Sequence, residues 1–101
     1  MKALIKRLDR LSSKLCRLQY KFSCHICQRE GTDAHHIVSR NHKRVRWDQF
    51  NLVYLCRDCH LKAHSENMTF GRDINQTVYI WSLPELKELE KELKLKIKEL
   101  K

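Results

Sequence analysis

CHICQREGTDAHHIV (Cys24–Val38) and NLVYLCRDCHLKAH (Asn51–His64) are the two stretches that decide the fold of this 101-residue chain. Each contains one Cys-x-x-Cys pair, Cys24/Cys27 in the first stretch and Cys56/Cys59 in the second. Pairs with this spacing are the turns from which tetrahedral thiolate sites for zinc are built, and two such turns supply four ligands. The sequence therefore predicts a structural Zn²⁺ held by all four cysteines.

The histidines of these stretches offer a second way to complete a zinc site. A site built from Cys24, Cys27, His60 and His64 is also tetrahedral, but it leaves Cys56 and Cys59 without partners. We therefore favour the four-cysteine site, which uses every sulfur of the two pairs. A thiol oxidoreductase is disfavoured, because no βαβ pattern surrounds either pair.

Length and charge narrow the class of protein. A chain of 101 residues buries only a modest apolar core, so we expect zinc to be part of the fold. The net charge of +9 indicates a polyanionic partner, with nucleic acid the first candidate. No apolar span is long enough for a membrane helix, and charged residues interrupt any signal-like segment near Met1. Reduced thiolates and a cytoplasmic location are the expectation.

Two amphipathic helices are predicted to flank the cysteine-rich core. In residues 1–22 the apolar side chains recur at helical spacing: Leu4, Leu8, Leu11, Leu15, Leu18 and Phe22. The other side of this helix is basic, which fits either a solvated face or contact with DNA phosphates. Residues 82–101 begin with the capping-box pattern Ser82-x-x-Glu85 and continue with a second apolar stripe. The two stripes can pack on each other and on the core, or pair across a homodimer.

Shorter elements are expected between these helices. Ala34–Ser39 and Leu52–Leu55 read as strands, and Arg57–Glu66 reads as a helix that places His60 and His64 on one face. The loop between the strands carries four cations, for which we predict phosphate contacts: Arg40, Lys43, Arg44 and Arg46. Trp47 and Phe50 are predicted to anchor this loop in the core. Residues 67–81 are a connector, and Thr77–Trp81 fits a strand or the start of the last helix.

The histidine pattern resembles that of the HNH nucleases. It consists of Ala34-His35-His36-Ile37, then Asn51 fifteen residues after His36, then His60 and His64. The two Cys-x-x-Cys pairs are similar to those of the zinc-containing branch, whereas colicin-type nuclease domains share the histidine order and lack the cysteines. Residues 8–18, with Arg46-Trp47-Asp48 and Leu55-Cys56, look further like phage recombination nucleases of the NinG (Rap) type. The HNH resemblance covers Cys24 to about Glu66.

This resemblance implies an α+β fold with a small ββα-metal core, and we expect residues 1–101 to form one HNH nuclease domain. By the same resemblance, His36 is the general base, and Asn51 restrains the loop and orients His36. The resemblance further implies that His35, His60 and His64 hold one catalytic divalent ion. His35 replaces the aspartate that many members carry before the base, so Mg²⁺, Mn²⁺, Ni²⁺ and Zn²⁺ all remain candidates.

Residue chemistry independently supports phosphodiester hydrolysis. A neutral imidazole has a reference pKa of about 6.5 and can deprotonate water near neutral pH. A divalent ion opposite the base stabilises charge on the phosphate and on the leaving oxygen. The leading interpretation is therefore a DNA endonuclease or nickase that acts on duplex or branched DNA. The alternative is a non-catalytic zinc module that binds nucleic acid through its basic surfaces.

Overall fold

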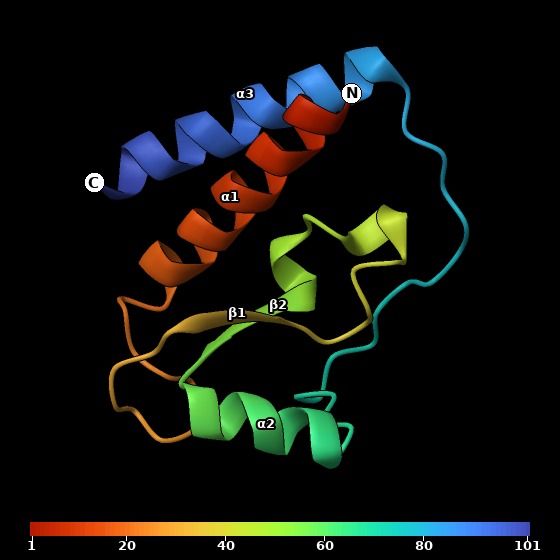
Figure 1. Cartoon of the computed structure of the whole chain (residues 1–101). Coiled ribbons are helices and arrows are strands. Elements are labelled where there is room, and N and C mark those ends of the chain that lie inside the picture. The colour runs from red at the N-terminus through yellow and green to blue at the C-terminus, as the bar shows by residue number, and fades with distance from the viewer.

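The computed structural model describes residues 1–101, and its helices and strands form three layers. In chain order they are α1 (Lys2–Gln19), β1 (Asp33–His36), β2 (Leu52–Leu55), α2 (Arg57–Ser65) and α3 (Leu83–Leu100). Two short 3-10 helices, η1 (Lys43–Val45) and η2 (Gln49–Asn51), lie between the strands. Figure 1 shows the sheet between α1 and α3 on one side and α2 on the other. The predicted α+β class is confirmed.

The sheet is a single antiparallel pair of strands, and β2 contacts the helices on both sides of it. β1 and β2 pair with Asp33 opposite Leu55 and His36 opposite Leu52. All four residues of β2 are buried. Because side chains alternate between the faces of a strand, Val53 and Leu55 pack with α2 and the cysteines, while Leu52 and Tyr54 pack with Cys16 of α1. β2 therefore fixes the position of α2 relative to α1.

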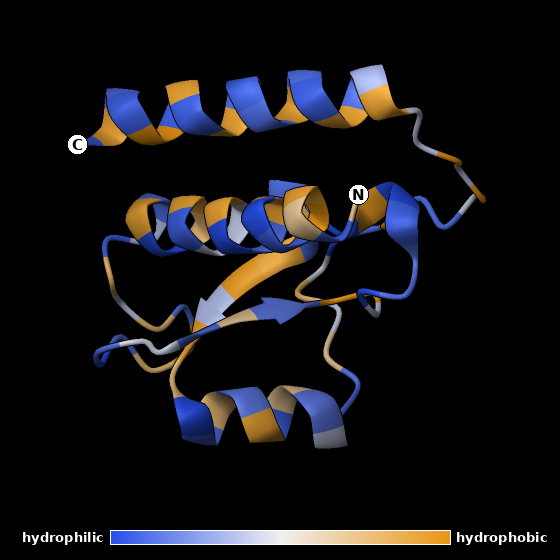
Figure 2. Cartoon of the chain, turned by 45° about the horizontal axis from the view of Figure 1, so that its top comes forward, coloured by the Kyte–Doolittle hydropathy of each residue, from blue (hydrophilic) through white to orange (hydrophobic).

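The terminal helices bury their apolar stripes against each other. Their shared core contains the following residues: Leu4, Leu8 and Leu15 of α1, Leu86, Leu93 and Ile97 of α3, and Trp47 from the loop. Figure 2 shows the apolar residues of α3 along the side that faces α1. The capping box predicted at Ser82 and Glu85 is present. The stripes that a homodimer through the terminal helices would use are thus occupied within one chain.

The first helix ends earlier than its apolar pattern predicts. α1 stops at Gln19, and both Lys21 and Phe22 adopt positive φ angles, of 54° and 65°. Phe22 is half exposed, so its assignment to the buried stripe is wrong. The chain turns here to enter the first cysteine pair, and the carbonyl of Phe22 accepts a hydrogen bond from the N–H of Gly31. The turn that leads into the first cysteine pair therefore ends α1 before the apolar pattern ends.

The first strand is shorter than predicted, because beyond it the side chain of Asn51 takes the place of backbone pairing. β1 ends at His36, whereas the sequence predicts a strand through Ser39. Beyond His36, the N–H and carbonyl of Val38 both bond to the side-chain amide of Asn51 instead of to a backbone partner. Helix α2 likewise ends at Ser65, one residue before the predicted end. Despite these shifts, His35 and His36 lie in a strand and His60 and His64 lie in a helix, as predicted.

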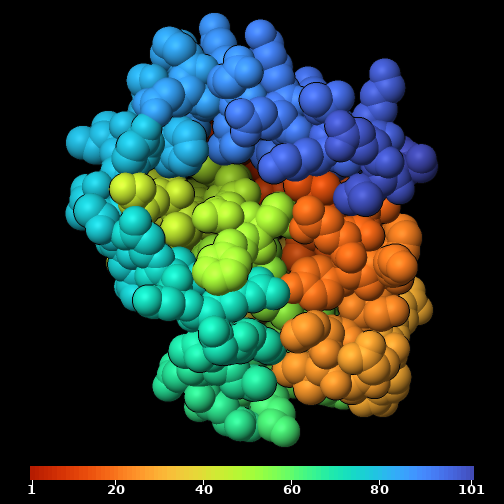
Figure 3. All heavy atoms as spheres, turned by 180° about the vertical axis from the view of Figure 1, so that it is seen from behind, coloured from red at the N-terminus to blue at the C-terminus, as the bar shows by residue number.

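The connector between α2 and α3 has no regular secondary structure. Thr77–Trp81 forms neither of the two elements that the sequence allows. Arg72 ties the connector to the core, donating to the carbonyls of Phe50 and Leu52 and to the Tyr20 hydroxyl. Figure 3 shows this segment along the outside of the molecule between α2 and α3. None of the three helices combines the length and apolar composition needed to cross a bilayer.

The two predicted aromatic anchors of the loop differ in their surroundings. Trp47 is 4% exposed and donates its indole N–H to Asp9 of α1, as expected of an anchor. Phe50 is 52% exposed and lies under the guanidinium of Arg72, so its assignment to the core is wrong. The difference arises because η2 turns Asn51, not Phe50, inward.

Candidate metal centres and active site

Four sulfurs converge from two turns to form the first centre, here called the sulfur cluster: Cys24, Cys27, Cys56 and Cys59. Their sulfurs all lie within 4.8 Å of one another, and the Cys27 and Cys56 sulfurs are 3.7 Å apart. A tetrahedral ion with Zn–S bonds of about 2.3 Å has edges of about 3.8 Å. The donor set and this spacing fit zinc, as the sequence predicts.

The protonation of the sulfur cluster also favours a bound cation. The backbone N–H and the guanidinium of Arg29 lower the pKa of Cys27 to about 6. Contact with the Cys56 sulfur, followed by burial, raises the pKa of Cys59 to about 12. Neighbouring thiolates repel one another, so four of them coexist only around a positive ion. The cluster is therefore built to be completed by a metal.

Three imidazoles form the second centre, here called the histidine cluster: His35 of β1 with His60 and His64 of α2. The ring centre of His35 lies 4.9 Å from that of His60 and 4.8 Å from that of His64. Nε2 of His60 and Nε2 of His64 are 3.1 Å apart. The two α2 residues meet because they are one helical turn apart. The sequence and the structure thus place the same three histidines together.

His35 shows that the cluster is suited to a metal. Its side chain is 3% exposed, and its Nδ1 is buried with no hydrogen-bond partner. Burial, with the nearby imidazoles of His60 and His64 next in importance, lowers the pKa of His35 to about 4. His35 is therefore neutral near pH 7, and a neutral imidazole is the form that binds metal ions. An unpaired buried nitrogen is costly unless a ligand occupies it.

Asp33 completes the surroundings of the histidine cluster, and sequence analysis missed it. Its Oδ2 lies 2.9 Å from Nδ1 of His60. An ionised carboxylate can only accept, so Nδ1 of His60 carries the proton and Nε2 keeps its lone pair. The available signal was the strand period, which places Asp33 and His35 on the same face of β1.

The sulfur cluster and the histidine cluster are separate groups. The alternative zinc site that combines Cys24 and Cys27 with His60 and His64 is therefore wrong. The two histidines point toward β1, whereas Cys56 caps the start of α2 and accepts a hydrogen bond from the N–H of Cys59 at 3.5 Å. One short helix thus contributes to both clusters from different sides.

His36 is held in one tautomer by the backbone. Its Nε2 lies 2.9 Å from the carbonyl oxygen of Arg46. A carbonyl can only accept, so Nε2–H donates and Nδ1 keeps the lone pair. Burial lowers the pKa of His36, and the bond to the Arg46 carbonyl opposes that shift only in part. His36 is therefore a neutral imidazole with one free basic nitrogen.

Asn51 closes the loop that carries this carbonyl. The side chain is fully buried. Its Oδ1 accepts from the N–H of Val38 at 2.8 Å, and its Nδ2 donates to the carbonyls of Val38 at 3.0 Å and Val45 at 3.1 Å. The bond to Val45 fixes the residue directly before Arg46. Asn51 thus reaches His36 indirectly, through the loop end that holds its ring.

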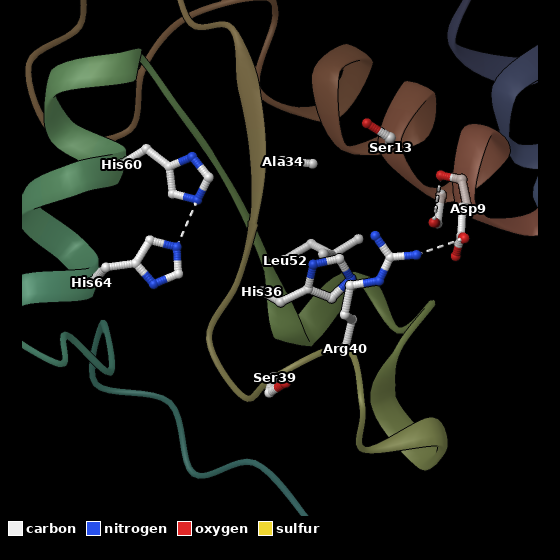
Figure 4. A pocket seen from close by; sticks show the side chains of 10 residues that line it. Asp9, Ser13, Ala34, His36, Ser39, Arg40, Leu52, His60 and His64 are labelled. Atoms are coloured by element: carbon white, nitrogen blue, oxygen red, sulfur yellow. Dashed lines mark hydrogen bonds and ion pairs between the residues drawn. The ribbon is translucent and has the colours of Figure 1, made fainter.

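Two hollows meet at the end of β1. The first, of ≈ 470 Å³, is lined by His36, His60 and His64 together with Arg40. The second, of ≈ 540 Å³, is lined by His35, His36 and His64. Figure 4 shows His60 and His64 on α2 across β1 from His36, with Arg40 beside His36. His36 therefore lines both hollows together with members of the histidine cluster.

Residues 24–66 match the family model described as HNH endonuclease. We call residues 24–66 the HNH core after this match. The match includes both clusters, His36 and Asn51, and it ends one residue after α2. No curated protein and no solved structure matches the chain. The terminal helices and the connector lie outside the matched segment.

The basic loop of the HNH core is largely paired with other residues. Asp9 of α1 accepts from Arg40 at 3.0 Å and from Arg46 at 2.8 Å. Burial alone would raise the pKa of Asp9, but the hydrogen bonds from Arg46 and Trp47 and the nearby charges outweigh it and lower that pKa. Arg44 donates to the carbonyl of Thr77. Of the four predicted phosphate contacts, Lys43 alone has no ion pair or side-chain hydrogen bond.

Proposed function

We propose that the HNH core is a metal-dependent DNA endonuclease or nickase that hydrolyses phosphodiester bonds in duplex or branched DNA. The observation that carries this proposal is that His36, whose Nδ1 is free, lines the same two hollows as the three residues of the histidine cluster. A base and a cation site beside each other are what phosphodiester hydrolysis requires. The family match supports the nuclease class.

In this proposal His36 acts as general base. Its Nδ1 takes a proton from water, the water oxygen forms a bond to phosphorus, and the bond from phosphorus to the 3′ oxygen breaks. The 3′ oxygen takes a proton from solvent, which leaves 5′-phosphate and 3′-hydroxyl ends. When bound at His35, His60 and His64, a divalent ion supplies charge stabilisation for the phosphate and the leaving oxygen.

The remaining polar residues of the core act by positioning. We infer that Asn51 keeps the Arg46 carbonyl on His36, and that Asp33 keeps the proton of His60 on Nδ1. Arg40 and Lys43 contact phosphates, since the Arg40 side chain is 56% exposed and Lys43 is unpaired. Arg44 and Arg46 hold the loop. An all-imidazole ligand set is softer than one with a carboxylate, so Mn²⁺, Ni²⁺ and Zn²⁺ are expected to compete with Mg²⁺.

The test is cleavage by the purified chain, with zinc bound at the sulfur cluster. Supercoiled, linear and branched DNA are incubated with Mg²⁺, Mn²⁺, Ni²⁺ or Zn²⁺ in parallel, and the ends of the products are mapped. His36→Ala is expected to lower the cleavage rate by about 10²- to 10⁴-fold, with DNA affinity kept. His42→Ala is the matched control, because His42 is an exposed histidine of the neighbouring loop. Equal cleavage by the His36→Ala and unsubstituted proteins contradicts the assignment of the base.

The net charge of +9 supports a second candidate, a non-catalytic zinc module that binds nucleic acid. The same experiment separates the two functions. The module binds DNA in a filter or gel-shift assay and produces no new ends with any of the four ions. The nuclease produces ends that disappear in His36→Ala while the gel shift remains.

A further inference from the structure

A third hollow adjoins the proposed active site on the side of α1. It has a volume of ≈ 400 Å³, and it shares Asp9 and Ser13 with the first hollow. Its other lining residues come from α1, from the residue before β1 and from β2: Arg10, Lys14, Arg17, Thr32 and Tyr54. The first and third hollows adjoin at Asp9 and Ser13 and are together called the α1 groove, which extends from His60 and His64 along α1 to Arg17.

The α1 groove is strongly basic. Four cations line it, Arg10, Lys14, Arg17 and Arg40, against the single carboxylate of Asp9. Asp9 adds little negative potential, because it is already paired with Arg40 and Arg46. The groove therefore offers a positive field that extends beyond the HNH core.

The α1 cations in the groove have no acidic partner within the chain. Elsewhere on the same helix Arg7 pairs with Glu90 of α3 at 2.6 Å, whereas Arg10, Lys14 and Arg17 form no ion pair. The Nε atom of Arg17 is buried without a hydrogen-bond partner. Lys14 lies beside Lys101 and Arg17, and these positive neighbours lower its pKa. An external anion would relieve this crowding, which a face that is merely solvated does not require.

We propose that the α1 groove binds the phosphodiester backbone of one DNA strand, next to the bond that the HNH core cleaves. This inference rests on the proposed nuclease function and specifies where its substrate lies. The strand leaves the histidine cluster, passes Arg40 and Ser13, and contacts Arg10, Lys14 and Arg17. A row of cations spaced along one helix matches the regular charge of a nucleic-acid backbone and reads no base sequence.

Binding measurements with paired charge variants test this proposal. All proteins carry His36→Ala, so that duplex DNA stays intact, and the full chain is used with zinc at the sulfur cluster. Arg10→Gln with Lys14→Gln removes two groove cations and leaves the packed Arg17 in place. Lys87→Gln with Lys91→Gln removes two exposed cations of α3 and is the matched control. Melting curves of both pairs are compared, because Lys14 is half-buried whereas Arg10, Lys87 and Lys91 are exposed.

The groove pair is expected to weaken duplex binding by about five- to tenfold. It is also expected to reduce the slope of log affinity against log salt by about 2, since each lost phosphate contact removes about 0.9. The α3 pair is expected to change both quantities little. Equal losses in the two pairs overturn the proposal, because they would indicate only the effect of net charge.

Crosslinking tests the path of the strand directly. A photo-crosslinking amino acid at Ser13 is expected to attach to DNA, and the same group at Lys91 is not. Reversal of this pattern overturns the proposal. Failure of the nuclease function has a different signature, namely absence of cleavage by the unsubstituted chain with every ion while the Ser13 crosslink and the salt slope are retained.

Discussion

The sulfur cluster and the histidine cluster are both groups of metal-binding side chains, yet the structure equips them differently. The sulfur cluster supplies four donors, which fills every position of a tetrahedral ion. The histidine cluster supplies three donors, is backed by Asp33, and opens onto a depression that also contains His36. Closed sites stabilise folds and open sites perform chemistry. This difference supports our proposal that the sulfurs stabilise the fold and that the histidines serve the reaction.

Cys56→Ser should have the largest effect, because it removes a ligand of the sulfur cluster, whereas the new hydroxyl can still cap α2. Structural zinc contributes on the order of 10 kcal/mol in small modules, which is comparable with the net stability of about 5–15 kcal/mol of a whole domain. We expect loss of bound zinc and of the cooperative melting transition, measured by elemental analysis and circular dichroism. Cys16→Ala is the control, because Cys16 is a buried cysteine outside the cluster. A Cys56→Ser protein that keeps its zinc and its melting transition would refute the structural assignment.

Asn51→Ala should have the next largest effect, on both stability and rate. It leaves the N–H and carbonyl of Val38 and the carbonyl of Val45 without their partner. We expect the free energy of unfolding to fall by about 2–4 kcal/mol, since a buried unpaired polar group costs about 1–3 kcal/mol. Cleavage should also fall by more than tenfold, on the order of one lost positioning contact. Asn41→Ala, in the exposed part of the same loop, serves as control. An unchanged cleavage rate in Asn51→Ala would show that Asn51 does not position His36.

Asp33→Asn sharpens the comparison, because it is expected to affect one cluster and not the other. Loss of the carboxylate on Nδ1 of His60 should weaken metal binding at the histidine cluster by about 10- to 100-fold. Zinc content of the sulfur cluster and the melting temperature should stay unchanged. Titration calorimetry with Mn²⁺ or Ni²⁺ measures the affinity, and Asp58→Asn in the first turn of α2 is the matched control. Equal affinities of the two variants would remove Asp33 from the site.

His25→Ala should have the smallest effect, although His25 lies inside the first cysteine pair. Its ring is exposed and rests against Tyr20 and Phe70, far from any role as a ligand. We expect a change in the free energy of unfolding within about 0.5 kcal/mol and unchanged cleavage. A large loss of zinc or activity in this variant would show that the division between the two clusters is incomplete.

Sequence analysis predicted most of the donors and missed most of their partners. The cysteine pairs, the spacing of His60 and His64, and the alternation of β1 are local patterns, and the structure contains all of them. The contact of His60 with Asp33 joins residues 27 positions apart, and that of Arg46 with Asp9 spans 37 positions. No local period reports such contacts. For the same reason no local pattern indicated that most cations of the basic loop are already paired.

The predicted ends of β1 and α1 were wrong because local contacts and turns ended these elements early. Asn51 takes over the bonds of Val38 and ends β1 at His36, and the turn at Lys21 and Phe22 ends α1 before its apolar stripe does. Phe50 and Trp47 are aromatic residues of one loop, yet only Trp47 carries an indole N–H, which donates to Asp9 of α1. These outcomes depend on which distant group is available, which a window of sequence does not contain.

By itself the sequence determined the chemistry available to this protein: four thiolates for a structural ion, a set of imidazoles, and a strongly basic surface. Residue type and short spacing suffice for that, because a ligand's donor atom and a helix's period are local properties. Only the tertiary structure decided that the ion-binding groups divide into a closed and an open cluster. It also decided that the Arg46 carbonyl leaves Nδ1 of His36 free, and that the unpaired cations of α1 line a groove leading to it. Hydrogen bonds between distant residues set tautomers and neutralise charges, and those bonds form only when the chain has folded.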